Sequence, residues 1–301
     1  MKIYKRAETR LFMRRVYVFI TLLVFAMPGF AQETVQKDSL QFNYREEQQS
    51  ERPLSPFDNI GNNFLNSFSG YKGLLQFAGI ASTYAIIHTD ADYHVSTFFR
   101  DHSFYANIAL PAVVLGSTLP LTTGGVLYFL GKHNSDNRMI GASFAVLQAG
   151  LITVAYISVL KGITGRAHPD ANSLADRKAV SSKFNFGLVR GGIYRGWPSG
   201  HVGAAMSVAS ALSHYYTEKT WLKYLTYGWV GYTMASVSAF HKGTMHWFSD
   251  AVAASLMTYT IGASVGSYYR NVMEGNKEDV KFRLFPVAVG DFSGVGVLYS
   301  F

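Results

Sequence analysis

The 301-residue sequence has no cysteine, no internal repeat and no long uninterrupted apolar run. The absence of cysteine excludes a disulfide framework and thiolate metal sites, which is compatible with a protein of the cell envelope. With 49% hydrophobic residues and no repeat, the chain can build one large core rather than a solenoid. A single domain with short appendages is therefore the simplest prediction.

Excess positive charge is scarce outside the beginning of the chain. Residues 1–31 hold +5 of the net charge of +8, which leaves +3 for the remainder. The charged side chains in this segment are Lys2, Lys5, Arg6, Glu8, Arg10, Arg14 and Arg15. Because so little excess charge remains elsewhere, no nucleic-acid partner is expected.

The basic start is followed by an apolar run over residues 16–26 and then by the small residues Gly29 and Ala31, at the positions that a signal peptidase reads. The run is short for a membrane span. We therefore predict a cleaved signal peptide over residues 1–31, with an uncleaved anchoring helix as the alternative. Residues 32–56 are rich in Gln, Glu and Ser, which predicts a polar linker.

Helical patterns follow from residue 57, in six ranges: 73–88, 106–131, 139–160, 200–216, 221–240 and 247–269. Pro111 and Pro120 are expected to kink or break the second of them. Ser, Thr, Tyr and Gly dilute several ranges, and such small residues suit close helix packing in lipid or in a protein core. We predict an all-α domain over residues 57–270 and a C-terminal extension, residues 271–301, with a small β-hairpin around Gly290 and Asp291.

Residues 196–201, Gly-Trp-Pro-Ser-Gly-His, combine several means of holding a phosphate group. Ser199 offers a hydroxyl, and Gly200 lets a backbone N–H approach an anion closely. The helix predicted to begin here directs its positive end toward the same place. His201 can then donate a proton. A helix cap beside a surface histidine would give the same short pattern, so this motif alone is weak evidence.

Two further motifs lie at the ends of apolar runs. In chain order, the first motif of the three runs from Lys161 to Pro169 as Lys-Gly-Ile-Thr-Gly-Arg-Ala-His-Pro, residues 196–201 hold the second, and the third runs from His246 to Asp250 as His-Trp-Phe-Ser-Asp. With these the chain, over roughly residues 70–270, resembles the phosphatidic acid phosphatase type 2 and vanadium haloperoxidase superfamily. The motifs of that superfamily are Lys-x6-Arg-Pro, Pro-Ser-Gly-His and Ser-Arg-x5-His-x3-Asp. The resemblance implies a six-helix bundle.

Two arginines of the family pattern are replaced in this sequence. His168 stands at the arginine of the first motif, and Ala239 and Phe240 stand where the third motif has Ser-Arg. Three residues lie close enough in sequence to supply the missing positive charge: Arg166, His241 and Lys242.

The resemblance implies a phosphatase whose nucleophile is His246, which becomes phosphohistidine, and whose general acid is His201. Asp250, one helical turn after His246, is expected to accept a hydrogen bond from the second ring nitrogen and so fix which nitrogen attacks. The expected phosphate-binding residues are Lys161, Ser199, Gly200, Arg166 and His168. No metal or other cofactor is implied. A zinc site is the alternative for His168, His201, His241 and His246, but their spacing matches no common zinc signature.

Residues 170–197 form a long basic segment between the first two motifs. Loops of this length are uncommon unless they are functional, so we predict a lid that selects the substrate, with a solvated surface loop as the alternative. Its candidate substrate contacts are Arg190, Arg195 and Trp197. Trp247, beside the third motif, is a further candidate for contact with an apolar tail.

The leading prediction is a phosphatase that hydrolyses the phosphate monoester or diphosphate of a membrane lipid, with a lipid phosphate and a membrane surface or bilayer as partners. The protein is expected to be exported, periplasmic, and associated with or integral to the membrane. If all six helices crossed, the first motif would face the cytoplasm, so we favour a domain that is soluble or rests on the membrane. The alternatives are a broad-specificity periplasmic acid phosphatase acting on small phosphate esters, a catalytically degenerate phosphate-binding envelope protein, and a vanadium haloperoxidase. In the last case the absence of the two arginines would weaken the binding of vanadate.

Overall fold

The computed structural model describes residues 54–102, 104–169, 177–190, 196–243, 245–275, 282–289 and 292–299. The chain divides into two compact units, Met1–Ser55 and Pro56–Phe301, and all the helices and strands given below belong to the second. The predicted signal peptide and nearly all of the predicted linker lie outside the described residues. They stay predictions.

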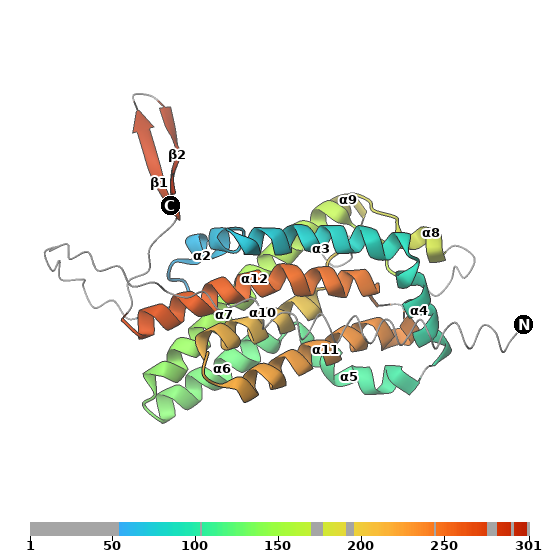
Figure 1. Ribbon diagram of the computed structural model, residues 1–301, viewed down its shortest axis with the longest axis horizontal. Coiled ribbons are helices and arrows are strands. Elements are labelled where there is room, and N and C mark those ends of the chain that lie inside the picture. The colour runs from blue at the N-terminus through green and yellow to red at the C-terminus, as the bar shows by residue number, and fades with distance from the viewer. Residues whose placement is uncertain are drawn as a thin grey trace, which may run out of the picture. The chain divides into compact units, whose positions relative to one another are not determined.

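The described part of Pro56–Phe301 is built mainly of helices (Figure 1). In chain order the helices are α2 (Ile60–Asn66), α3 (Tyr71–His88), α4 (Ala91–Asp101), α5 (Phe104–Gly116), α6 (Leu119–His133), α7 (Asn137–Thr164), α8 (Arg177–Ser181), α9 (Gly187–Arg190), α10 (Gly200–Tyr215), α11 (Thr220–Gly243) and α12 (Phe248–Met273). Two strands follow, β1 (Phe282–Val289) and β2 (Phe292–Tyr299). They pair antiparallel, with Phe282 opposite Tyr299 and Val289 opposite Phe292.

The expected count of six helices does not describe this arrangement. The second predicted range, 106–131, is divided into α5 and α6, which meet at a bend of 60°. Pro120 lies in the first turn of α6, where a missing backbone N–H costs nothing, whereas Pro111 lies inside α5. The short helices α2, α8 and α9, and the eleven-residue α4, add to the long ones.

Local sequence signals set the two ends of α7. At its start the Asp136 carboxylate accepts a hydrogen bond from the Met139 N–H at 2.9 Å, which satisfies one of the free donors of the first turn. At its end Gly165 has φ +46°, a left-handed conformation that glycine adopts at little cost. Lys161 therefore lies in the last turn of a well-bounded helix.

The centre of the bundle is the contact between α10 and α12, with α3, α7 and α11 packed around them (Figure 1). Gly262 and Gly266, one helical turn apart on α12, face the α10 backbone. A Cβ at Gly262 would lie 2.5 Å from the Ser207 carbonyl oxygen, and one at Gly266 would lie 2.3 Å from that of Ala211. Small residues thus allow the two backbones to approach closely. The N-terminal ends of both helices carry motif residues.

Helix α7 is long and apolar enough to cross a membrane, and the bent pair α5 and α6 would be a second candidate if it formed one span. These are the candidates among the described residues. A core helix of a soluble protein passes the same test, and half of the apolar window of α7 is buried within the bundle.

Candidate active site

The three sequence motifs meet at one end of the helices that carry them. Direct hydrogen bonds join them: the Thr164 hydroxyl donates to the Trp197 carbonyl at 2.9 Å, and the Ser199 N–H donates to the Asp250 carbonyl at 3.1 Å. The Trp247 indole N–H donates to the Ala167 carbonyl at 2.7 Å. The C-terminal end of α7 and the N-terminal ends of α10 and α12 therefore form a single site.

His246 lies close to both of the other motif histidines. Its ring centroid is 5.3 Å from that of His168 and 6.4 Å from that of His201. His246 is buried, whereas His168 and His201 are partly exposed. The three motif histidines are therefore neighbours in the site.

The ring of His246 is held by the carboxylate of Asp250. The distance from His246 Nδ1 to Asp250 Oδ2 is 3.1 Å, and the same oxygen accepts the Trp247 N–H at 3.2 Å. Because the carboxylate accepts, Nδ1 carries the proton and Nε2 keeps its lone pair. Asp250 thus supports the first turn of α12 in the manner of a capping-box residue and fixes the tautomer of His246 at the same time.

Burial lowers the pKa of His246 to about 4, and the nearby positive charge of Lys161 and His168 acts in the same direction, while Asp250 opposes it. His246 is therefore neutral at neutral pH, and its contact with Asp250 is a hydrogen bond to an uncharged ring rather than an ion pair. A neutral ring with a free nitrogen is the form that a nucleophile requires.

Lys161 supplies positive charge beside the N-terminus of α10. It is buried, and its Nζ lies 3.8 Å from the place where a Cβ on Gly200 would be. Burial lowers the pKa of Lys161, and the carboxylate of Asp250 partly restores it. An ammonium group, a side-chain-free glycine and the positive end of a helix thus come together, which is an arrangement suited to an anion.

Ser199 is the N-cap of α10, and its hydroxyl oxygen accepts the Val202 N–H at 3.5 Å. The residue is fully buried. The hydroxyl oxygen is the acceptor in this contact, so the hydroxyl proton is not used in it.

His201, in the first turn of α10, is held in place by α5, a helix that carries none of the three motifs. Its ring is hydrogen bonded to the backbone carbonyl of Val113 and packs against Gly116, both on α5. Burial lowers the pKa of His201, and the charge of Lys161 lowers it further, against the effect of the Val113 carbonyl. A bound phosphate dianion would raise it again.

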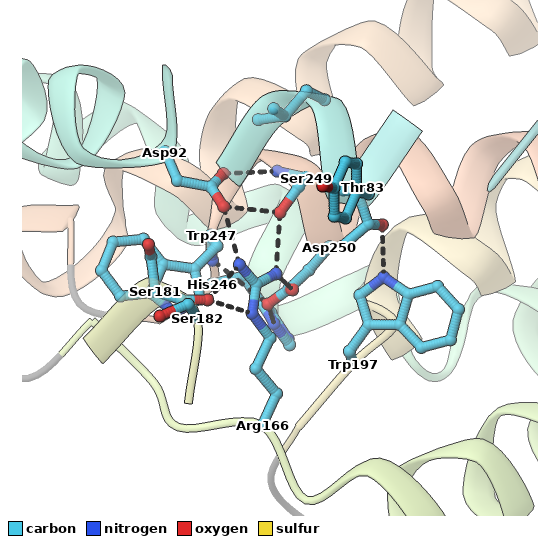
Figure 2. Close-up of polar contacts among 12 residues, drawn as sticks. Thr83, Asp92, Arg166, Ser181, Ser182, Trp197, His246, Trp247, Ser249 and Asp250 are labelled. Carbon is cyan, nitrogen blue, oxygen red and sulfur yellow. Dashed lines mark hydrogen bonds and ion pairs between the residues drawn. The ribbon is translucent and has the colours of Figure 1, made fainter. Parts of the chain in front are cut away.

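Arg166 does not have the geometry expected of a phosphate-binding residue (Figure 2). Its side chain is completely buried, and its five N–H donors all have acceptors within the protein. The acceptors are carboxylate oxygens of Asp92 and Asp250, the Ser249 hydroxyl and the Ser181 carbonyl. Arg166 therefore lies behind the Asp250 carboxylate and has no donor left for a substrate.

Trp197 and Trp247 also differ from the expectation of substrate contact. Trp197 packs in the core with Ala253 and Met257, and its indole N–H donates to the Thr83 hydroxyl at 2.8 Å. Trp247 is fully buried. Both indole rings lie in the interior of the bundle, where the Thr83 hydroxyl and the Ala167 carbonyl accept their N–H groups.

Part of the predicted lid can be described, as the short helices α8 and α9. The segment between them is joined to the end of α7, because the Asn185 N–H donates to the Thr164 carbonyl at 3.0 Å and the Ala167 N–H donates to the Lys183 carbonyl at 3.1 Å. Arg195 and the side chain of Arg190 lie outside the described residues, as do the side chains of His241 and Lys242. Their predicted roles stay predictions.

Asp92 is a site residue that the sequence motifs did not indicate. It lies on α4 and is almost fully buried, with Oδ2 2.7 Å from Arg166 Nη2. Its carboxylate accepts the Ser249 N–H at 2.8 Å and the Ser249 hydroxyl at 2.6 Å. No three His, Asp or Glu side chains of the described residues are grouped so as to hold a metal ion.

Comparison with known proteins gives one match. Residues 139–274 match the family model of the PAP2 superfamily, the same family that the three motifs indicate. This range contains all the motif residues, α7 except for its first two residues, and the helices α8 to α12. The comparisons with curated proteins and with solved structures found no match.

Proposed function

We propose that this chain is a metal-independent phosphatase that works through a phosphohistidine on His246. Residues 139–274 match the PAP2 superfamily, whose members are generally phosphatases. The observation that carries the proposal is the state of His246, a buried neutral imidazole with Nδ1 directed to Asp250 and Nε2 free. Lys161 and the N-terminus of α10 provide positive charge beside it.

In the first step, Nε2 of His246 attacks phosphorus in line with the leaving oxygen, the P–O bond breaks, and the proton of His201 passes to that oxygen. In the second step, water attacks the phosphoryl group, its proton goes to His201, and the N–P bond breaks to release inorganic phosphate. Lys161, the Ser199 hydroxyl and the Gly200 N–H hold the equatorial oxygens through both steps. His168, 5.3 Å from His246 between ring centroids, is a fourth ligand as imidazolium.

The two catalytic histidines must be in opposite protonation states, which sets the pH range of activity. His246 is neutral above a pKa of about 4, whereas His201 has a pKa lowered by burial and must be protonated to act as the acid. The population with both in the correct form is therefore largest on the acid side of neutrality.

A lipid substrate is supported by the apolar surface of the bundle. Along one face of α3, Leu74, Phe77 and Tyr84 are 72%, 74% and 66% exposed, at helical spacing. Further large apolar side chains are exposed on α6 and α7, among them Leu121 and Val159. Large exposed apolar side chains on the outer faces of several helices support contact with a membrane or another protein, so we propose that the protein is exported and associated with a membrane.

A phosphate-release assay of the purified protein tests the proposal. The substrates are a lipid phosphate monoester in detergent micelles, a polyprenyl diphosphate and a soluble aryl phosphate, each with His246→Ala as the matched variant. We expect release from the lipid substrates by the wild type and none by the variant. Comparable rates on every ester would favour the broad-specificity acid phosphatase, and no release from any of them would contradict phosphatase activity.

A further inference from the structure

Three buried charges form a chain that begins on α4 and ends next to His246 (Figure 2). Arg166 pairs with the carboxylates of Asp92 and Asp250, and each of the three side chains is at most 4% exposed. Buried charges are expensive unless they are paired and hydrogen bonded. An arrangement that places two of them behind a catalytic aspartate calls for a reason beyond stability.

The two oxygens of Asp250 have different partners. Oδ1 is bound by the guanidinium of Arg166, and Oδ2 is bound by His246 Nδ1 and the Trp247 N–H. The carboxylate is therefore held from both sides, and rotation about its terminal bond would break contacts on each. Only an arginine can do this while also reaching Asp92 and the Ser181 carbonyl, because its donors diverge in one plane.

Asp92 fixes the other side of Arg166. It binds Nη2, and it is itself fixed to α12 through the N–H and the hydroxyl of Ser249, the residue that precedes Asp250. The Ser249 hydroxyl also accepts from Arg166 Nη1 at 2.7 Å. Asp92, Arg166 and Ser249, which are far apart in the chain, thus form a closed set of hydrogen bonds beside His246.

We propose that Arg166 and Asp92 are positioning residues that hold the Asp250 carboxylate against His246 and balance its charge. This inference rests on the proposed function, since the position of His246 matters only if the ring takes part in the reaction. The arginine within the first motif then serves the nucleophile and not the phosphate.

The charge of Arg166 has a second consequence. The charged and titratable groups that face His246 are Asp250 from α12, Lys161 from α7 and His168 and His201 from the neighbouring motifs, with Arg166 and Asp92 behind Asp250. The guanidinium offsets the negative charge of Asp250, which would otherwise favour a proton on His246. Removing it should make His246 easier to protonate.

The double variant Arg166→Gln with Asp92→Asn tests this. It removes one positive and one negative charge together. Arg166 contacts the Asp250 carboxylate directly, whereas Asp92 lies on the other side of the guanidinium, so His246 should respond mainly to the loss of the guanidinium. Ser249→Ala is the matched control, because it removes the neutral hydroxyl that binds both Arg166 and Asp92 and leaves all the charges. Three quantities are measured on the full-length protein: the pH at which the His246 ring titrates by NMR, the dissociation constant of inorganic phosphate, and kcat on a soluble aryl phosphate.

For the double variant we expect the pH at which His246 titrates to rise by about one unit, which is equivalent to about a tenfold increase in the proton affinity of the ring. We expect kcat to fall by roughly tenfold to a hundredfold, as for a misplaced catalytic group, with the phosphate dissociation constant changed less than about twofold. In Ser249→Ala the titration of His246 should not move. If the double variant does not fold, Arg166→Lys, which keeps the charge but not the fork, should show the same loss of kcat at unchanged phosphate affinity.

Phosphate affinity that weakens in step with kcat would overturn the inference, because Arg166 would then be a phosphate ligand. An unchanged titration of His246 in the folded double variant would overturn it as well. If the wild-type protein released no phosphate from any ester, the proposed function would fail, but the titration would still decide whether Arg166 acts on His246 through Asp250.

Discussion

Because His201 packs against α5, we predict that a methyl group added at Gly116 displaces His201 and so impairs the general acid. A Cβ on Gly116 would lie 2.5 Å from Cδ2 and 2.9 Å from Cβ of His201. Non-bonded carbon atoms separate to about 3.5 Å or more, so Gly116→Ala requires a displacement of about 1 Å. A misplacement of that size costs roughly a hundredfold in rate when the displaced group takes part in the reaction.

The assay compares kcat on an alkyl phosphate, whose leaving oxygen needs a proton, with kcat on an aryl phosphate that carries a good leaving group. Gly116→Ala should lower kcat on the alkyl ester by roughly a hundredfold and on the aryl ester by much less. Gly125→Ala on α6 is the matched control, because a Cβ there meets no atom within 4 Å, and its activity should equal that of the wild type. Unchanged activity of Gly116→Ala on the alkyl ester, or equal losses on both esters, would refute the reasoning.

Three further predictions concern acid stability, the departure at His168 and export. Burial lowers the pKa of His214 to about 4 from 6.5, so the neutral ring stabilises the fold fully above pH 6.5 and this stabilisation is lost as the pH falls toward 4. Between pH 7 and pH 4, the free energy of unfolding of His214→Asn in urea should therefore fall by about 3 kcal/mol less than that of the wild type. An identical pH dependence of the two proteins would contradict the assignment. His168→Arg should keep activity on an activated ester to higher pH than the wild type, because arginine stays charged; if it and His168→Ala both left the pH profile unchanged, His168 would lie outside the phosphate site. N-terminal sequencing of the envelope-extracted protein should begin near Gln32, whereas a sequence that starts at Met1 would contradict cleavage.

The motif residues were located in the sequence by their match to the family pattern, and in the structure each lies at a helix end. Lys161 is in the last turn of α7, Ser199 caps α10, and Asp250 is in the first turn of α12. Helix ends follow from local signals such as a serine cap or a glycine in the left-handed region, so short-range patterns are sufficient to place them. The site residues that depend on these ends were therefore the most accessible to prediction.

The partners of these residues could not be predicted in the same way. Arg166 was assigned to the phosphate because it lies within the first motif, but its acceptors come from Asp92 and Asp250, which are 74 and 84 residues away in the chain. Asp92 has no motif and no periodic signal of its own. Trp197 lies next to the second motif, yet its ring is buried because Thr83 on α3 supplies the acceptor for its N–H. Such pairings depend on tertiary packing, which a local pattern does not encode.

Detection of the covalent intermediate is the direct test of nucleophilic attack by His246. The protein is mixed with an aryl phosphate at acidic pH, quenched in alkali to preserve a phosphorus–nitrogen bond, digested and analysed by mass spectrometry. We expect one phosphoryl group on His246 in the wild type, with more of it in His201→Ala on this ester, because formation needs little acid catalysis whereas hydrolysis needs a base. Steady turnover with no phosphoryl group on His246, in either the wild type or His201→Ala, would contradict a phosphohistidine mechanism.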